Sequence, residues 1–356
     1  MVNYIVRRIL IAVPLLLAMS FVTFVLMKLA PGDVLAAYRL NPQFSEETIR
    51  RIEQEYGIGR PPFIPRLRAS IFEHFSWFTN LPGGTWTADL LLKMLEAAVQ
   101  YLQWLRNLLV GNLGYSFTNK APVTDVIKSK LRNTLLLSIA SLLMTWLLAI
   151  PMGIYCAVHR NTITDKLFSF LAFFGMAIPD FFFALLLVFI ASATGILPTG
   201  GATSEGYEAM SAVGKGIDLL EHLIIPTVVI STGSMAVLQR IMRGNMLEVL
   251  REQYVTTARA KGLPENRVIY RHALRNAINP MVTIFGYELS ALLSGAALVE
   301  IVCGWPGIGI TMLTAVRSKD IFLVMGSMMI GGVMLLVGNL VADLLLALVD
   351  PRIRYD

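Results

Sequence analysis

Charge is scarce in this chain. Only 15% of its 356 residues are Asp, Glu, Lys or Arg, whereas 55% are hydrophobic and the mean hydropathy is +0.63. Soluble domains are about a quarter charged, so the composition points away from an ordinary soluble domain and predicts an integral membrane protein. The net charge of +6 does not indicate nucleic-acid binding. The basic residues cluster at the ends of apolar runs, as the positive-inside rule expects.

Cysteine and histidine are also rare. The only two cysteines, Cys156 and Cys303, lie on the topology given below at opposite faces of the bilayer. Roughly 30 Å of hydrocarbon would separate them, which is too far for a disulfide. The four histidines are scattered along the chain and form no metal-ligand pattern.

Sequence motifs for catalysis are missing. No G-x-x-x-x-G-K-[ST] phosphate loop occurs, so no ATP site of that type is encoded here. No H-E-x-x-H motif or Ser/His/Asp arrangement indicates hydrolysis. The chain is therefore predicted to be non-catalytic and to bind no cofactor or metal itself. If it drives transport, the energy must come from another polypeptide.

Six apolar runs are long enough to cross a bilayer as helices, which predicts an all-α, polytopic membrane protein. They are residues 9–29, 133–158, 167–197, 220–242, 281–302 and 321–349. Arg7-Arg8 before the first run and arginines beside the later ones place both termini in the cytoplasm. A cleaved signal peptide is the alternative for the first run, but a signal core is only about 7–15 residues long. Pro179, near the middle of the third run, predicts a kink.

These runs divide the chain into three parts. Residues 1–30 form an N-terminal transmembrane helix, residues 31–132 an extracytoplasmic segment with amphipathic helices, and residues 133–356 a five-helix core. The stretch 90–109 reads as a helix, but Glu96, Gln100, Gln103 and Arg106 interrupt it. An interfacial or packed helix is therefore favoured there, and a further span is the alternative.

The most distinctive stretch is polar and separates the fourth and fifth runs. Residues 252–280 read EQYVTTARAKGLPENRVIYRHALRNAINP, with five Lys or Arg before residue 276 against two Glu. Gly262 suits the left-handed cap that ends a helix, and Pro264 suits the first turn of the next one. The pattern predicts two short helices joined by a tight turn, forming a basic cytoplasmic docking surface. The alternative is a loop that only sets topology, which needs charge but not this spacing.

This stretch resembles the EAA loop of ABC importer membrane subunits. The resemblance is closest to the dipeptide/oligopeptide/nickel permease family of binding-protein-dependent transport systems. The matching residues are Tyr254, Ala258, Arg259, Ala260, Lys261, Gly262, Leu263, His272, Leu274, Arg275, Asn276 and Pro280. The general Glu-Ala-Ala is Thr256-Thr257-Ala258 here, a departure usual in the peptide branch. LAPGD at 29–33, GWPG at 304–307 and DPRIR at 350–354 also resemble that family, whereas residues 63–97 have no recognised counterpart and no assigned role.

The resemblance implies a permease subunit that imports peptides across the bacterial cytoplasmic (inner) membrane. It implies a second homologous permease, two ATPase subunits that hold ATP and Mg, and an extracytoplasmic substrate-binding protein. The loop 243–280 would couple to the ATPases through Tyr254, Ala258, Arg259, Lys261, Gly262, Leu263, His272, Arg275 and Asn276. Peptides are the family's commonest cargo, and nickel, glutathione and oligosaccharides are the alternatives.

Two acidic residues lie inside the predicted spans. Their presence there requires an explanation, because a charge in a bilayer is costly. Asp180 and Glu288 are candidates for the translocation path, and bonding to neighbouring helices is the alternative. A stand-alone secondary transporter using either carboxylate as a proton site is a second hypothesis, and an inert assembly scaffold is a third.

Two strips of small residues predict close helix packing, within the chain or against another subunit. They are Gly286, Ser290 and Ser294, and Gly331, Gly338 and Ala342.

Overall fold

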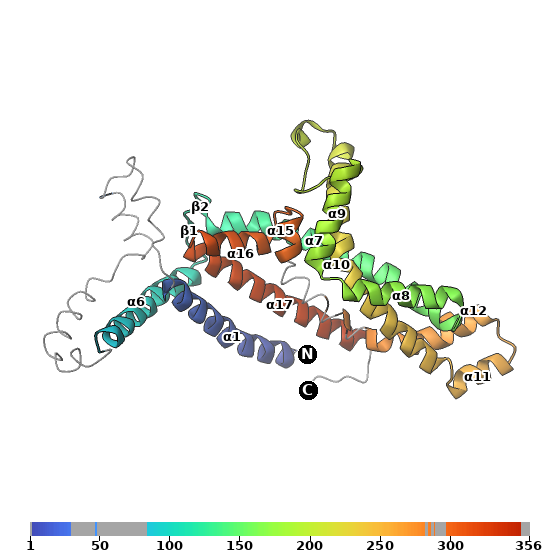
Figure 1. Cartoon of the computed structure of the whole chain (residues 1–356). Helices are drawn as coiled ribbons and strands as arrows, with labels where there is room; N and C mark the ends of the chain where they lie inside the picture. Colours follow the sequence, from blue (N-terminus) through green and yellow to red (C-terminus); the bar gives the residue numbers. More distant parts are fainter. Residues whose placement is uncertain are drawn as a thin grey trace. The chain divides into compact units, whose positions relative to one another are not determined.

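Helices make up nearly all of the computed structural model, which describes residues 2–29, 47, 84–281, 284, 285, 288 and 297–349. Figure 1 shows the elements in chain order. The helices that lie before the polar loop are α1 (Val2–Leu29), α6 (Gly84–Leu109), α7 (Val123–Val158), α8 (Ile163–Ala177), α9 (Asp180–Thr194), the 3-10 turn η1 (Tyr207–Ala209) and α10 (Ala212–Val249). The helices within and after the polar loop are α11 (Gln253–Ala260), α12 (Glu265–Arg267), the π-helical turn η2 (Val268–Ala273), α13 (Leu274–Ala277), α15 (Ala297–Val302), α16 (Ile308–Arg317) and α17 (Ile321–Val349). One small antiparallel hairpin pairs β1 (Tyr115–Ser116) with β2 (Ala121–Pro122).

Four described helices are long and apolar enough to cross a membrane. They are α1 over Val6–Leu29, α7, α10, and α17 over Ile321–Val341. The bent pair of α8 and α9 would make a fifth span if it crosses as one unit. The all-α polytopic fold is thus confirmed. The fifth predicted span, residues 281–302, falls largely outside the described residues, so the number six and the three-part division of the chain stay predictions.

The third predicted span is two helices, not one. α8 and α9 meet at a bend of 103°. Ile178 is extended, with φ −87° and ψ 124°, because proline disfavours the helical conformation of the residue before it. Pro179 then caps α9, and Gly195 in the left-handed conformation ends it. The expected kink is therefore a full break, and the first helix begins at Ile163 rather than at residue 167.

Three other helices extend beyond the apolar runs that predicted them, and the first of these, α1, begins at Val2 rather than at residue 9. α7 begins at Val123 rather than at residue 133, and α10 covers Ala212–Val249 rather than 220–242. The side chain of Ser211 caps the start of α10 by accepting from the Gly214 N–H. A hydropathy run marks only the part of a helix that suits hydrocarbon, so polar turns that continue the helix escape it.

The chain forms two compact units, of which the smaller contains residues 7–129 and 311–330. Its core packs Tyr101 and Trp104 of α6 against Phe24 of α1 and the first turns of α17. Asp320, next to α17, is buried and accepts from the Ser116 hydroxyl at 2.7 Å and the Thr118 N–H at 3.1 Å. This carboxylate fixes the hairpin to the start of α17.

The larger unit contains residues 1–6, 130–310 and 331–356. One of its cores joins the C-terminal halves of α7 and α10 to the polar loop. Its members include Ala149, Ile154 and Ala157 of α7, Leu238, Met242 and Met246 of α10, and Val255, Ala258, Val268, Ile269, Ala273, Ala277 and Met281 of the loop. The loop is thus a folded part of this unit. In Figure 1 it is the orange segment that carries the labels α11 and α12.

Candidate coupling site

The polar loop folds as two short helical arms around a left-handed glycine. α11 ends at Ala260, and Gly262 has φ +75° with open space around its Cα. Only glycine adopts this conformation without a Cβ penalty. Pro264 is extended and stands one position before α12, as its N-cap, rather than inside its first turn. The two predicted short helices are present, but the second arm has a π-helical middle that the sequence did not indicate.

One face of the loop is buried in its own protein. Val255, Val268 and Ala273 are completely buried, and Ala258 is 6% exposed. Ala258 was predicted to take part in ATPase coupling; here it packs inward, against the α7 and α10 core. Leu263 is half-buried and packs against the same core, and His272 is also half-buried. These residues therefore support the predicted docking surface from beneath.

The opposite face of the loop is exposed and basic. Its predicted coupling residues are Tyr254, Arg259, Lys261, Gly262, Arg275 and Asn276. Two of them are brought together, because the Asn276 amide donates to the Tyr254 hydroxyl at 2.7 Å and ties α11 to α13. Arg259 makes an ion pair across the glycine turn, with its NH2 group 2.7 Å from Glu265. That hydrogen bond holds the pKa of the Glu265 carboxyl below its usual value.

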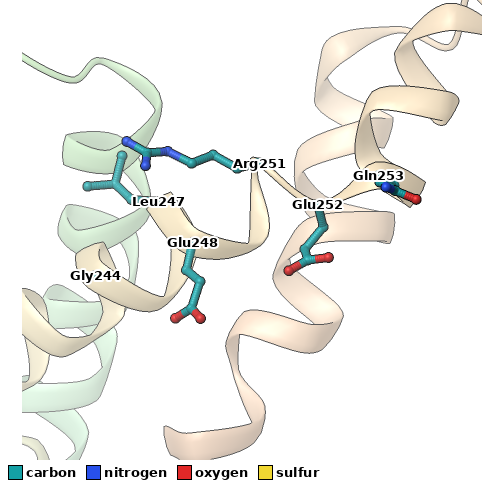
Figure 2. Close-up of a pocket in the computed structure, with 6 residues that line it drawn as sticks. All are labelled: Gly244, Leu247, Glu248, Arg251, Glu252 and Gln253. Carbon is teal, nitrogen blue, oxygen red and sulfur yellow. The ribbon is translucent and has the colours of Figure 1, made fainter.

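A pocket of about 460 Å³ lies where α10 passes into α11. Its lining residues are Gly244, Leu247, Glu248, Arg251, Glu252 and Gln253. In Figure 2 the carboxylates of Glu248 and Glu252 point to the same side, while Arg251 extends the other way. The side of the pocket that Glu248 and Glu252 line is therefore an acidic recess beside the basic face of the loop, whereas Arg251 adds one positive charge to the lining. This pocket was not predicted. Its residues surround the C-terminal end of α10, which the apolar run placed at residue 242, seven residues before the observed end at Val249.

An ion pair that the sequence did not reveal joins the C-terminal end of α10 to α8. Arg243 donates two parallel hydrogen bonds to Asp165, at 2.7 and 2.8 Å. Asp165 also accepts from the Asn161 N–H at 2.9 Å, and its side chain is only 4% exposed. Arg243 was interpreted only as a flank of an apolar run, and Asp165 was not singled out. The signal that could have found them is an Arg and an Asp at the inner ends of neighbouring spans.

The acidic residues predicted inside the spans lie in different surroundings. Asp180 is the exposed first residue of α9. Glu288 is half-buried and accepts from the Trp146 indole at 2.7 Å. Ser234 of α10 is a further hydrogen-bond partner of that carboxylate. Among the described residues no hydrogen bond joins Asp180 to Glu288, so the structure does not bring these two candidates together.

A third acidic residue, Glu300 of α15, was overlooked although it is completely buried. It accepts from the Thr134 hydroxyl at 3.1 Å and the Ile310 N–H at 3.0 Å. Thr134 in turn accepts from the Ile308 N–H at 2.8 Å. The carboxylate thus binds the start of α16 to α7. Its hydrogen-bond partners mark it as structural.

Comparison with known proteins gives the class to which this fold and loop belong. The family described as "Binding-protein-dependent transport system inner membrane component" matches residues 149–355. The chain belongs to that family, and it is therefore a permease component of a binding-protein-dependent transport system.

Individual relatives match along the whole chain. It is 36% identical to the "Oligopeptide transport system permease protein AppB" of Bacillus subtilis, over 100% of both chains. It is 31% identical to the "Di/tripeptide transport system permease protein DppB" of Pseudomonas aeruginosa, again over 100% of both. It is 30% identical to the "Dipeptide transport system permease protein DppB" of Escherichia coli, over 100% of this chain and 99% of the relative. The resemblance read from the loop is confirmed.

Proposed function

We propose that this chain is a peptide permease subunit of an ATP-driven importer of the bacterial cytoplasmic membrane, and that the loop 243–280 couples it to ATPase subunits. The full-length relatives carry the names of oligopeptide, di/tripeptide and dipeptide permeases, which supports peptides as the cargo. The single observation that carries the coupling role is the two-faced loop, basic outside and fused to the α7 and α10 core inside.

The inner face of the loop explains how force would pass to the membrane helices. Val255 and Val268 are completely buried with Met246 of α10. Packed interiors have low compressibility and transmit strain, so α11 cannot be displaced without moving the inner end of α10. The Arg243–Asp165 pair extends this linkage from α10 to α8. ATP-driven closure of the ATPases would then tilt these helices and change which side the translocation path faces.

The outer face supplies the docking contacts in this proposal. Lys261, Arg271 and Arg275 are exposed, and they would pair with acidic groups of the ATPase. The acidic recess at Glu248 and Glu252 would receive a basic side chain from the same partner. Two opposite charge patches side by side fix the register of a docked protein, because a shifted partner would place like charges together.

A second homologous permease would complete the translocation path, and an extracytoplasmic binding protein would deliver the peptide. We place both termini of the chain in the cytoplasm. Glu288 and Asp180 remain our candidates for the path, with Glu288 held in position by Trp146. ATP and Mg would be bound by the ATPase partners. A stand-alone proton-coupled transporter or an inert scaffold does not fit membership of a binding-protein-dependent family.

A pair of variants at Gly262 tests the coupling role. Asn and Asp both tolerate the left-handed conformation and have the same size, and open space surrounds this Cα. We expect Gly262→Asp, which puts a negative charge on the basic docking turn, to abolish peptide uptake and transport-coupled ATP hydrolysis in proteoliposomes. Gly262→Asn should retain most of both activities. Membrane insertion should be unchanged in each. Normal transport by Gly262→Asp would refute docking through this turn.

Cargo is tested separately. Mass spectrometry of the ligand that co-purifies with the cognate binding protein should find short peptides. Nickel, glutathione or an oligosaccharide in their place would overturn the peptide assignment and leave the coupling role intact.

A further inference from the structure

Helix α6 presents a row of exposed leucines. Leu91, Leu95, Leu102 and Leu109 repeat at intervals of four or seven residues, so they share one side of the helix. Leu102 is 63% exposed and Leu109 is 83% exposed. On another side of α6, Trp104 and Tyr101 are buried in the core of the smaller unit. We call the four exposed leucines the leucine row.

The side of α6 that carries Tyr101 packs against α1. The Tyr101 hydroxyl donates to the Leu17 carbonyl at 3.0 Å and lies 2.8 Å from the Ser20 hydroxyl. Its ring also packs edge-on against Phe21 and Phe24, with centroids 5.2 and 5.8 Å away. Figure 1 shows α6 and α1 converging at the C-terminal end of α6. The position of Tyr101 along α1 is therefore fixed by several contacts.

That position gives the depth of α6 in the membrane. α1 is apolar enough to span the membrane, and Lys28 is the basic residue at its C-terminal end. At about 1.5 Å per helical residue, Phe24 lies about 6 Å, and Leu17 at most about 17 Å, from Lys28 along the helix. Half of the hydrocarbon layer is about 15 Å thick. The contacts of Tyr101 with Ser20, Phe21 and Phe24 therefore lie inside the leaflet that contains the Lys28 end of α1, and its hydrogen bond to Leu17 lies near the bilayer midplane.

We propose that α6 is embedded in that leaflet, with the leucine row in contact with lipid acyl chains. Leu102 follows Tyr101 directly, so it lies at the same depth while pointing away from α1. α1 also has exposed apolar side chains at this depth, such as Val22 and Leu26. Arg106, one turn from Leu102, is exposed and long enough to carry its charge toward the head groups.

The composition of α6 agrees with an embedded helix that does not cross the membrane. Lys93, Glu96 and Arg106 interrupt it, and it is not among the described helices that are apolar enough to span. Amphipathic helices of this kind lie in the boundary between acyl chains and head groups. α6 would thus anchor to the bilayer the segment 31–132, in which the sequence favours an interfacial or packed helix over residues 90–109.

Fluorescence quenching by lipids tests this placement. The full-length chain, with Cys156 and Cys303 replaced by alanine, receives a single cysteine labelled with bimane. In phospholipid nanodiscs without any soluble protein, emission is measured with doxyl groups on the acyl chains and with aqueous iodide. Leu102→Cys is the test position and Gln103→Cys its exposed, polar neighbour. Leu26→Cys gives the lipid reference and Glu205→Cys the aqueous one.

We expect the loss of emission caused by doxyl lipid at residue 102 to match that at residue 26 and to exceed that at residue 103. Iodide should quench residue 102 less than residue 205. Strong iodide quenching at residue 102 would overturn the proposal and leave the leucine row to a soluble partner. Protection from both quenchers would also overturn it, because a second protein surface in the membrane would then cover the row. Leu95→Cys provides an independent repeat on the same side of α6.

Discussion

The guanidinium of Arg243 and the carboxylate of Asp165 face each other in a two-pronged ion pair, with nitrogen–oxygen distances of 2.7 and 2.8 Å. Arg243 belongs to the C-terminal end of α10, and Asp165 to the first turn of α8. The pair therefore connects the helix that leads into the polar loop with the helix that precedes the break at Pro179.

Removal of this ion pair is expected to weaken both stability and coupling. Asp165→Asn leaves the arginine without its counter-charge, and such losses cost about 1–3 kcal/mol. Arg243→Lys keeps the charge but cannot donate in parallel, so its effect should be smaller. Thermal unfolding of the purified chain and the ratio of peptide uptake to ATP hydrolysis are the measurements. If Asp165→Asn lowers neither one, the pair is not part of the linkage.

Glu265 and Arg259 allow a prediction of pH dependence. Arg259 donates to Glu265, and this holds the pKa of the carboxyl below its ordinary value of 4.5. A lowered pKa in the folded state stabilises the protein above pH 4.5, and that contribution disappears as the pH falls through the lowered value. Both side chains are about half exposed, so the contribution is at most about 1 kcal/mol.

The wild type and Glu265→Gln should therefore differ slightly and constantly in thermal unfolding between pH 7 and pH 5. Their difference should shrink only at more acidic pH. A difference that grows on acidification would contradict the assigned pair.

The Tyr254–Asn276 hydrogen bond is expected to matter more for docking than for folding. It is 2.7 Å long, lies on the exposed face and joins α11 to α13. Tyr254→Phe removes one exposed hydrogen bond, which costs about 0.5–1.5 kcal/mol at most. The relative orientation of the two arms would loosen, so ATP-driven peptide uptake should fall while the amount of inserted protein stays the same. Asn276→Ala should give the same phenotype, and the double variant should add nothing further.

How much of this could be read from the sequence differs between the membrane helices and the site. Apolar runs found α1, α7, α10 and α17, because hydrocarbon demands long apolar helices. Gly262 was found because a left-handed cap demands glycine. The lengths of α7 and α10 could not be found, since polar turns leave no hydropathy signal.

The contacts of the site were harder to predict, for a different physical reason. Asp165 and Arg243 are 78 residues apart and meet only through the packing of α8 on α10. Ala258 matched a family motif, but a motif does not say whether a small residue faces a partner or its own core; the structure places it in the core. Glu300 looked like the end of a span until its hydrogen bonds to α16 and α7 were visible. The predicted strip that includes Gly286 lies outside the described residues.

Two glycines of α17 provide a matched test of helix packing. A Cβ at Gly326 would lie 2.6 Å from Val123 Cγ1 and 2.8 Å from Ile127 Cδ1, both on α7. At Gly331, which the sequence placed in a packing strip, a Cβ would meet nothing within 4 Å. Gly326→Ala should therefore overpack the contact with α7 and destabilise the protein by about 1–3 kcal/mol. Gly331→Ala should be neutral or stabilise it by up to about 1 kcal/mol through helix propensity.

Thermal unfolding of the two variants in the same detergent gives the comparison. Equal midpoints would show that α7 and α17 are not in close contact at Gly326. A loss of peptide uptake by Gly331→Ala, with unchanged unfolding of the isolated chain, would instead show that this glycine packs against a second subunit.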